Sequence, residues 1–121
     1  MEKSAIRNNL LKVRKNKFFI KYDQKKVVNF ILDQKINIIG GYFPINYEFN
    51  CLDILDQLSK KVSISLPIMK KNNQMDFYKW KNNDPLKINN FGIPEPVNST
   101  SVYPDILLVP LVGFDKNLNR L

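Results

Sequence analysis

The chain has 121 residues, of which 44% are hydrophobic, and this is enough for one folded domain with a core and argues against a disordered chain. It contains no His and one Cys, so histidine catalysis, histidine metal ligation, a Cys–His nucleophile pair and an intramolecular disulfide are excluded. No segment has the roughly 20 apolar residues of a membrane span or the apolar stretch of a signal peptide. We therefore expect a cytoplasmic protein with no membrane partner.

The net charge of +8 is concentrated near the N-terminus, because residues 1–35 hold ten Lys or Arg against three acids and the remainder holds nine against eight. A basic helix of this kind can contact nucleic acid through phosphates, or it can bind one polyanionic ligand such as a nucleotide. A solvated helix face explains the same charges equally well. The charge pattern alone leaves these interpretations open.

Two helices are predicted in the N-terminal third. Ile6, Leu10 and Val13 recur at helical spacing with charges between them, and they predict a helix over residues 2–16. Apolar residues recur in the same way over residues 23–34, so a second helix is expected there.

A strand and a third helix are predicted next. Residues 36–43 are β-branched and aromatic and end at Pro44, which is typical of a strand. Asn50 is a suitable N-cap for a helix over residues 51–60, with Asp53 in the first turn, where the helix dipole favours an acid.

The second half of the chain is predicted to contain strands and a long loop. Residues 62–66 form a further apolar strand, and residues 69–80 predict a hairpin that turns at Asn72 and Asn73. Residues 81–104 contain four prolines and are expected to be mostly loop.

A last apolar strand is predicted over residues 106–109. Near-continuous apolar strands separated by helices indicate an α/β fold with three layers, in which a mostly parallel sheet carries helices on both faces (Rossmann-like), within a single domain over residues 1–121. No helix follows the last strand, so we expect the domain to be incomplete at its C-terminus. Ligands of such sheets bind beyond the carboxyl ends of the strands, so the loop after this strand should lie at the site.

Spacing alone assigns no catalytic residue. The chain has four glycines, no Gly-x-Gly-x-x-Gly motif and no Walker loop, and its acids are scattered. The catalytic residues are therefore unknown, and no metal ligand is assigned.

Four ordered segments nevertheless resemble one known family. The sequence from Asp105 to Asp115 (Asp-Ile-Leu-Leu-Val-Pro-Leu-Val-Gly-Phe-Asp), with Arg120 and Leu121 following, is similar to a late motif of the 5-formyltetrahydrofolate cyclo-ligase (methenyltetrahydrofolate synthetase) family. Three earlier segments match the same family in the same order: an N-terminal Lys-x-x-x-Arg helix (residues 3–7), a Tyr-x-Pro-x-x-x-Glu turn (residues 42–48) and a Gly-Ile-Pro-Glu-Pro loop (residues 92–96). The resemblance covers nearly the whole chain.

The resemblance implies an ATP-dependent reaction. ATP activates the formyl oxygen on N5 of 5-formyltetrahydrofolate, N10 attacks the imidate carbon, and phosphate leaves to give 5,10-methenyltetrahydrofolate. The cofactors would be ATP and Mg²⁺, and the partner would be the folate substrate rather than nucleic acid. The oligomeric state is left open.

The resemblance also assigns binding residues. It places Lys3 and Arg7 at ATP-contacting positions, and it aligns Arg120 and Leu121 with the start of a phosphate-binding loop. Lys3 and Arg7 are four residues apart and thus share one helix face, although a solvated pair is the plain alternative.

Two further residues match the folate-binding positions of the family. Glu48 corresponds to a carboxylate that accepts hydrogen bonds from the pterin, and Phe43 corresponds to an apolar residue of the same pocket. The alternatives are a surface acid for Glu48 and an ordinary core aromatic for Phe43. Arg14 is a secondary candidate, and Glu95 fits a structural loop as well as a binding one.

The chain departs from the family at its end. Leu118 stands where glycine is common, and the family's Gly-Tyr-Gly-Gly-Gly-Tyr-Tyr-Asp segment, with its metal-binding Asp, does not follow Leu121. We therefore expect the chain to represent the N-terminal portion of a cyclo-ligase domain with little activity of its own. The alternative function is a non-catalytic basic binding module, a nucleic-acid or folate-binding remnant.

Overall fold

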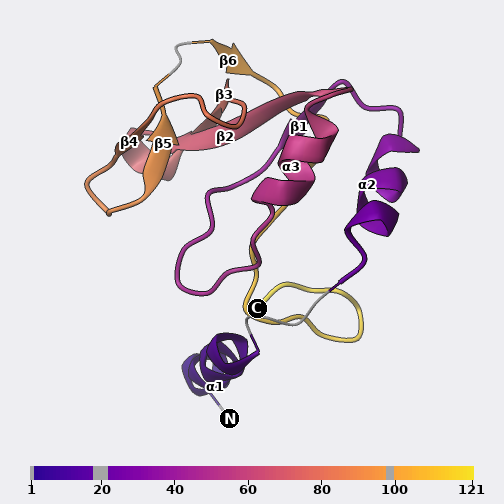
Figure 1. Cartoon of the computed structure of the whole chain (residues 1–121). Helices are drawn as coiled ribbons and strands as arrows, with labels where there is room; N and C mark the ends of the chain where they lie inside the picture. Colours follow the sequence, from indigo (N-terminus) through magenta and orange to yellow (C-terminus); the bar gives the residue numbers. More distant parts are fainter. Residues whose placement is uncertain (1, 18–21, 98–99) are drawn as a thin grey trace.

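The computed structural model describes residues 2–17, 22–97 and 100–121 of the chain (Figure 1). Its helices are α1 (Lys3–Asn16), α2 (Gln24–Leu32), α3 (Leu52–Leu58) and a short 3₁₀ turn, η1 (Lys71–Asn73). Its strands are β1 (Ile38–Gly40), β2 (Ser63–Met69), β3 (Met75–Lys79), β4 (Leu86–Ile88), β5 (Pro94–Pro96), β6 (Ser101–Val102) and β7 (Ile106–Leu107).

The three predicted helices are confirmed. Helix α2 begins after Asp23, whose side chain accepts a hydrogen bond from the N–H of Lys26 at 3.1 Å. Helix α3 begins one residue later than expected, so Cys51 is its N-cap and not Asn50 as predicted. The side chain of Asn50 accepts from the N–H of Leu52 at 3.0 Å, and Asp53 lies in the first helical turn as predicted.

Five strands form the main sheet in the order β6-β3-β2-β1-β7. Strand β1 pairs in parallel with both β2 and β7, and Ile39 lies opposite Ile64 on one side and Ile106 on the other. Strands β3 and β6 are antiparallel to their neighbours. The predicted α/β class is therefore confirmed, with parallel strands on the β7 side and antiparallel strands on the β6 side.

The hairpin predicted over residues 69–80 is confirmed, but its first arm is longer than expected. Strand β2 continues through Met69 instead of ending at residue 66. Asn72 and Asn73 have φ angles of 64° and 60°, a left-handed conformation that Asn tolerates better than most residues. The N–H of Lys70 donates to the carbonyl of Gln74 at 2.6 Å and closes the turn.

The prediction of mostly loop over residues 81–104 was wrong in part. Strands β4 and β5 form a separate two-stranded sheet, and β6 lies at an edge of the main sheet. The prolines of β5 are tolerated because an edge strand does not need every backbone N–H. The side chain of Asn89 shapes the connecting turn by accepting from the N–H groups of Phe91 (2.8 Å) and Ile93 (3.0 Å).

Helices α2 and α3 pack against each other, and α3 packs on β2 (Figure 1). The core cluster contains Val28 and Ile31 of α2 and Ile54, Leu55 and Leu58 of α3, and from the strands Ile39, Ile64 and Leu66. Helix α1 is different: it contributes no buried residue and lies apart from the sheet, beside the C-terminal loop.

Gly40 and Gly41 are consecutive, and a Cβ added to each would point to opposite faces of the sheet. A Cβ added at Gly41 would lie 2.5 Å from Cδ1 of Leu55, so glycine is required for α3 to approach the chain this closely. A Cβ added at Gly40 would instead lie 2.7 Å from the side chain of Leu107 and 2.8 Å from that of Phe77. Because side chains alternate along a strand, Phe77 and Leu107 lie on the face away from α3.

Asp105 joins the start of β7 to the start of β1. Its carboxylate accepts hydrogen bonds from the N–H groups of Asn37 (2.9 Å) and Ile38 (3.0 Å), and these bonds lower the pKa of the carboxyl. A lowered folded-state pKa stabilises the fold above the unfolded pKa of about 3.9, and this contribution is lost as the pH falls through the lowered value.

We therefore expect the free energy of unfolding to fall more steeply below about pH 4 in the wild type than in Asp105→Asn. Urea unfolding at a series of pH values measures this difference. Asp33→Asn, at an exposed site, is the control. Parallel pH profiles for wild type and Asp105→Asn would contradict the prediction.

Candidate functional site

A pocket of about 330 Å³ lies beyond the carboxyl ends of the parallel strands, as the fold predicts. Its walls come from the segments that follow β1 and β7 and from the last residues of β2. Phe77 and Leu107 line it, so it lies on the face of the sheet away from α3.

The pocket brings together three of the six predicted site residues. Phe43, Glu48 and Arg120 line it, and so does Glu95. Lys3 and Arg7 do not line it, because they lie on the exposed surface of α1, and Leu121 lies outside it as well. The structure thus separates the predicted folate-binding residues from the two cations of α1.

Glu48 presents a carboxylate to the pocket from a tight turn. Its Oε1 accepts from the N–H of Ile45 at 3.0 Å, and its own N–H donates to the carbonyl of Ile45 at 2.9 Å. No described residue donates to its other carboxylate oxygen. Asn46 and Tyr47, just before it, have φ angles of 49° and 60°, so two successive left-handed residues aim Glu48 into the pocket.

Phe43 is half-buried in the pocket wall and lies outside the main core cluster. The surrounding surface is apolar, because Met69, Met75 and Phe77 of the hairpin also line the pocket. Aromatic and methionine side chains of this kind pack well against a flat ring. Sequence reasoning missed the hairpin residues, although the spacing of two between Met75 and Phe77 places them on one face of the strand.

Glu95 is one of the most deeply buried polar residues, at 5% exposed. Its Oε2 accepts from the N–H of Met69 at 2.9 Å and so ties β5 to the end of β2. This bond gives Glu95 a structural role in shaping the pocket wall. The sequence left a structural and a binding role open for Glu95. The structure gives its Oε2 a structural role.

Arg120 closes the C-terminal loop over the pocket. Its Nη2 donates to the carbonyl of Pro110 at 2.8 Å, and residue 120 forms an isolated bridge with Phe114. The N–H of Leu121 donates to the carbonyl of Gly113 at 3.0 Å. The loop therefore folds back on itself and keeps Arg120 at the pocket.

Asp115 organises the tip of this loop. Its carboxylate accepts from the side chain of Asn119 at 3.0 Å and from the backbone N–H groups of Asn119 (2.9 Å) and Asn117 (2.8 Å), and these bonds lower its pKa. Leu118 has a φ of 63°. A glycine, the residue common at this position in the family, adopts such a left-handed conformation more readily than leucine does.

Tyr42 and Cys51 stabilise the two ends of the segment that carries Phe43 and Glu48 by hydrogen bonds to its backbone. The hydroxyl of Tyr42 donates to the carbonyl of Phe49 at 2.7 Å, and the thiol of Cys51 donates to the carbonyl of Tyr42 at 3.2 Å. Burial raises the pKa of both groups, so both stay protonated. The contact that the structure gives to the Cys51 thiol is thus a structural one, to the backbone of Tyr42.

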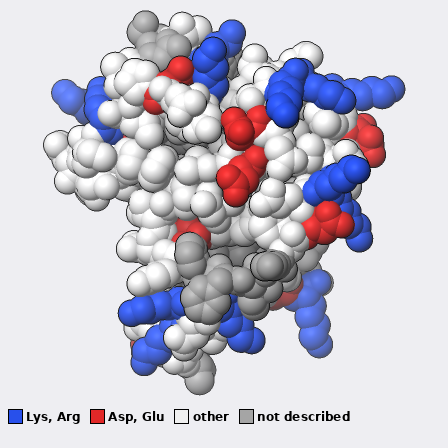
Figure 2. Space-filling view, in the orientation of Figure 1, with Lys and Arg blue, Asp and Glu red and all other residues white. Residues whose placement is uncertain are grey.

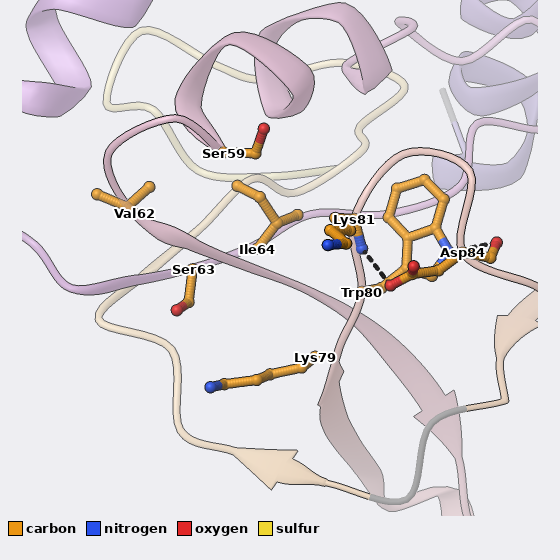
Figure 3. Close-up of a pocket in the computed structure, with 8 residues that line it drawn as sticks. All are labelled: Ser59, Val62, Ser63, Ile64, Lys79, Trp80, Lys81 and Asp84. Carbon is orange, nitrogen blue, oxygen red and sulfur yellow. Dashed lines mark hydrogen bonds between the residues drawn. The ribbon is translucent and has the colours of Figure 1, made fainter.

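A second hollow of about 360 Å³ lies at the start of β2 (Figure 3). The indole of Trp80 donates to the carbonyl of Asp84 at 3.2 Å, and the N–H of Lys81 donates to the carboxylate of Asp84 at 3.1 Å. The side chain of Lys79 points away from this group. The polar groups of this hollow serve a turn rather than converging on a ligand.

The described residues contain neither a cluster of metal-binding side chains nor a helix that could span a membrane. Among them, no three His, Cys, Asp or Glu side chains gather in a way that could hold a metal ion. Over the same part of the chain, no helix combines the length and apolar character needed to cross a bilayer.

Comparisons with known proteins agree with one another. A model of the 5-formyltetrahydrofolate cyclo-ligase family matches residues 1–121. The chain is 29% identical over 134 residues to a 5-formyltetrahydrofolate cyclo-ligase of Haemophilus influenzae, and the match covers 99% of this chain and 72% of that protein.

Solved structures show the same fold. The NMR structure of 5,10-methenyltetrahydrofolate synthetase from Aquifex aeolicus matches with a TM-score of 0.73 and 26% identity, over 95% of this chain and 63% of that one. A 5,10-methenyltetrahydrofolate synthetase from Mycoplasma pneumoniae matches with a TM-score of 0.67 and 21% identity, over 100% of this chain and 71% of that one. The chain thus spans just under two thirds of the Aquifex protein. With a family model matched over its whole length, the chain belongs to the 5-formyltetrahydrofolate cyclo-ligase family, a family of ATP-dependent ligases.

Proposed function

We propose that the cyclo-ligase domain to which this chain belongs converts 5-formyltetrahydrofolate to 5,10-methenyltetrahydrofolate at the expense of ATP, with release of ADP and phosphate. The observation that carries the proposal is the carboxylate of Glu48, held by Ile45 in an apolar pocket beyond the carboxyl ends of the strands. A pterin ring has amino and N–H donors along one edge, and these suit a charged acceptor. The pocket volume of about 330 Å³ is within the range of small-molecule sites.

The ring would lie against Phe43 and the methionines of the hairpin, with its donors toward Glu48. Against these apolar walls the bound ring would displace water, which would strengthen its electrostatic contact with Glu48. In the proposed reaction, the formyl oxygen on N5 attacks the γ-phosphorus of ATP and ADP leaves. N10 then attacks the activated carbon and loses its proton, and phosphate departs with the former formyl oxygen.

We propose that Lys3, Arg7 and Arg120 bind the triphosphate. Phosphoryl transfer depends mainly on positioning and on neutralising charge, for which fixed cations are suited. Lys3 and Arg7 share one face of α1, and neither has a hydrogen-bond or ion-pair partner among the described residues. Leu121 is kept as a predicted contact beside Arg120, although its N–H is already bonded to Gly113.

Magnesium is proposed only as a companion of ATP. The described residues do not form a ligand set for it by themselves. Mg²⁺ is commonly held by substrate phosphates together with one or two carboxylates, so it would enter with the nucleotide. No step above depends on it.

The alternative of a nucleic-acid-binding module requires a continuous basic surface. On the face drawn in Figure 2, the Lys and Arg side chains lie in separate groups with acids between them. On this face, the distribution favours local anion sites over a continuous nucleic-acid-binding surface. The folate substrate is therefore the proposed partner, and the cytoplasm remains the proposed compartment.

The test is a coupled assay of the purified protein with 5-formyltetrahydrofolate and ATP. We expect a methenyl product, detected by its absorbance, and ADP in equal amounts, with no ADP when folate is omitted. 5-Methyltetrahydrofolate is the chemical control, because it has no carbonyl oxygen to accept a phosphoryl group. ATP hydrolysis that ignores the folate, or folate that does not bind at all, would contradict the proposal.

A further inference from the structure

Arg14 connects helix α1 to the turn that carries Glu48. Its Nη2 donates to the carbonyl of Asn46 at 2.7 Å, across 32 positions of sequence. Its Nε is buried and has no hydrogen-bond partner among the described residues. An unpaired buried donor is costly, so its presence in a half-buried arginine calls for a reason other than stability.

The turn it contacts is conformationally demanding. Asn46 and Tyr47 both have left-handed φ angles, of 49° and 60°. Such residues persist where their surroundings hold them. Arg14 holds the first of them through its carbonyl, and Nζ of the neighbouring Lys15 lies 5.6 Å from the centroid of the Tyr47 ring. Glu48 is the next residue, so its orientation depends on this pair of contacts.

Helix α1 itself is weakly attached to the rest of the protein. It buries no residue, and Leu10 approaches the body of the protein at Gly113. An element with so little buried surface has a low local stability, and a ligand that binds it can shift its equilibrium position. Arg14 is thus both a contact between α1 and the turn that carries Glu48 and a means of transmitting changes in α1.

The candidate ATP cations lie on the same stripe of this helix. Positions 3, 7 and 14 are separated by four and seven residues, spacings that return to nearly the same side of an α-helix. Lys3 and Arg7 therefore project from the side on which Arg14 contacts Asn46. An anion bound between these cations would restrain the helix that positions the turn.

We propose that Arg14 is a positioning residue that couples nucleotide binding on α1 to folate binding at Glu48. Triphosphate bound to Lys3 and Arg7 fixes the position of α1, and Arg14 then fixes Asn46. The carboxylate of Glu48 is therefore already oriented when the folate substrate arrives. This inference rests on the proposed function, because it takes the two ligands from it. By linkage, folate raises the affinity for nucleotide by the same factor.

The test measures the affinity for 5-formyltetrahydrofolate by calorimetry, with and without a saturating non-hydrolysable ATP analogue. In the wild type, we expect the analogue to tighten folate binding by about 5- to 150-fold, the usual range of coupling between sites. In Arg14→Ala, the two folate affinities become equal. Arg14→Lys keeps the charge and one donor and is expected to recover part of the coupling.

Lys12→Ala is the matched control, because it removes one exposed charge from the same helix and should leave the coupling at the wild-type value. Circular dichroism of each variant shows that α1 still folds. A wild type that binds both ligands independently would overturn the inference while leaving the proposed function intact. So would an Arg14→Ala variant with undiminished coupling. A wild type that binds no folate would instead overturn the proposed function, and the inference with it.

Discussion

Glu48→Gln is expected to weaken the binding of 5-formyltetrahydrofolate by about 10- to 150-fold. This factor corresponds to the 1.5 to about 3 kcal/mol typical of hydrogen bonds to a charged group, which a neutral amide loses. The glutamine oxygen can still accept from the N–H of Ile45, the bond that now measures 3.0 Å, so the turn should keep its shape. The effect should therefore fall on the ligand and not on the fold.

Calorimetric titration of folate and of an ATP analogue, each alone, separates the two ligands. The affinity for the analogue should change by less than about twofold, because the predicted nucleotide contacts are made by residues of α1 and by Arg120, not by Glu48. Glu2→Gln is the control for loss of one negative charge at an exposed site. Equal losses for both ligands would mean that Glu48 acts through the structure rather than through the pterin.

Leu55→Ala is expected to lower the free energy of unfolding by about 2 to 5 kcal/mol, the cost of a cavity in a packed core. Leu55 is 1% exposed and packs where α3 meets the chain after β1. Gly41→Ala is expected to cost about 1 to 3 kcal/mol for the opposite reason, overpacking. Its new Cβ would lie 2.5 Å from Cδ1 of Leu55.

The double variant shows whether the cost of Gly41→Ala comes from the contact with Leu55 or from a loss of stability that is independent of Leu55. When Leu55 is already alanine, the methyl group at position 41 enters free space, so the two effects should be strongly non-additive. Urea unfolding of the four proteins gives the coupling free energy. Phe30→Ala, at a residue 67% exposed on α2, is the control and should change stability little. Additive losses would show that Gly41 is required for a reason other than Leu55.

Local patterns predicted the elements whose stability depends on near neighbours. Helix α2 followed from apolar spacing, and it begins after Asp23 as a capping side chain requires. The turn at Asn72 and Asn73 followed from the tolerance of Asn for left-handed backbone. The parallel pairing of β1 with β2 followed from two apolar segments separated by a helix.

Features that depend on distant pairing could not be predicted in this way. Strand β5 consists of two prolines around Glu95, and it is a strand only because β4 lies beside it. The edge position of β6 likewise depends on its pairing with β3. Helix α1 has the pattern of a packed helix, yet Ile6 and Val13 are 37% and 47% exposed. Periodicity predicts the helix but not what covers it.

The candidate site was predicted to a similar extent. The fold class located it beyond the carboxyl ends of the strands, and the family motif selected Phe43, Glu48 and Arg120, which the pocket brings together. The binding roles of these residues and of Lys3 remain predictions. The hydrogen bond from Arg14 to Asn46 had no local signal, because the two residues are 32 positions apart.

The thiol of Cys51 allows movements of the turn that carries Glu48 to be followed by chemical labelling. It is the only sulfhydryl in the chain, it is completely buried, and its proton is shared with the carbonyl of Tyr42. A thiol-specific reagent can reach it when the contact between Cys51 and Tyr42 opens and the segment between them comes away from the core. The rate of labelling therefore reports how often the segment that carries Glu48 opens, as amide hydrogen exchange would. No cysteine has to be introduced for this measurement, because Cys51 is native to the chain.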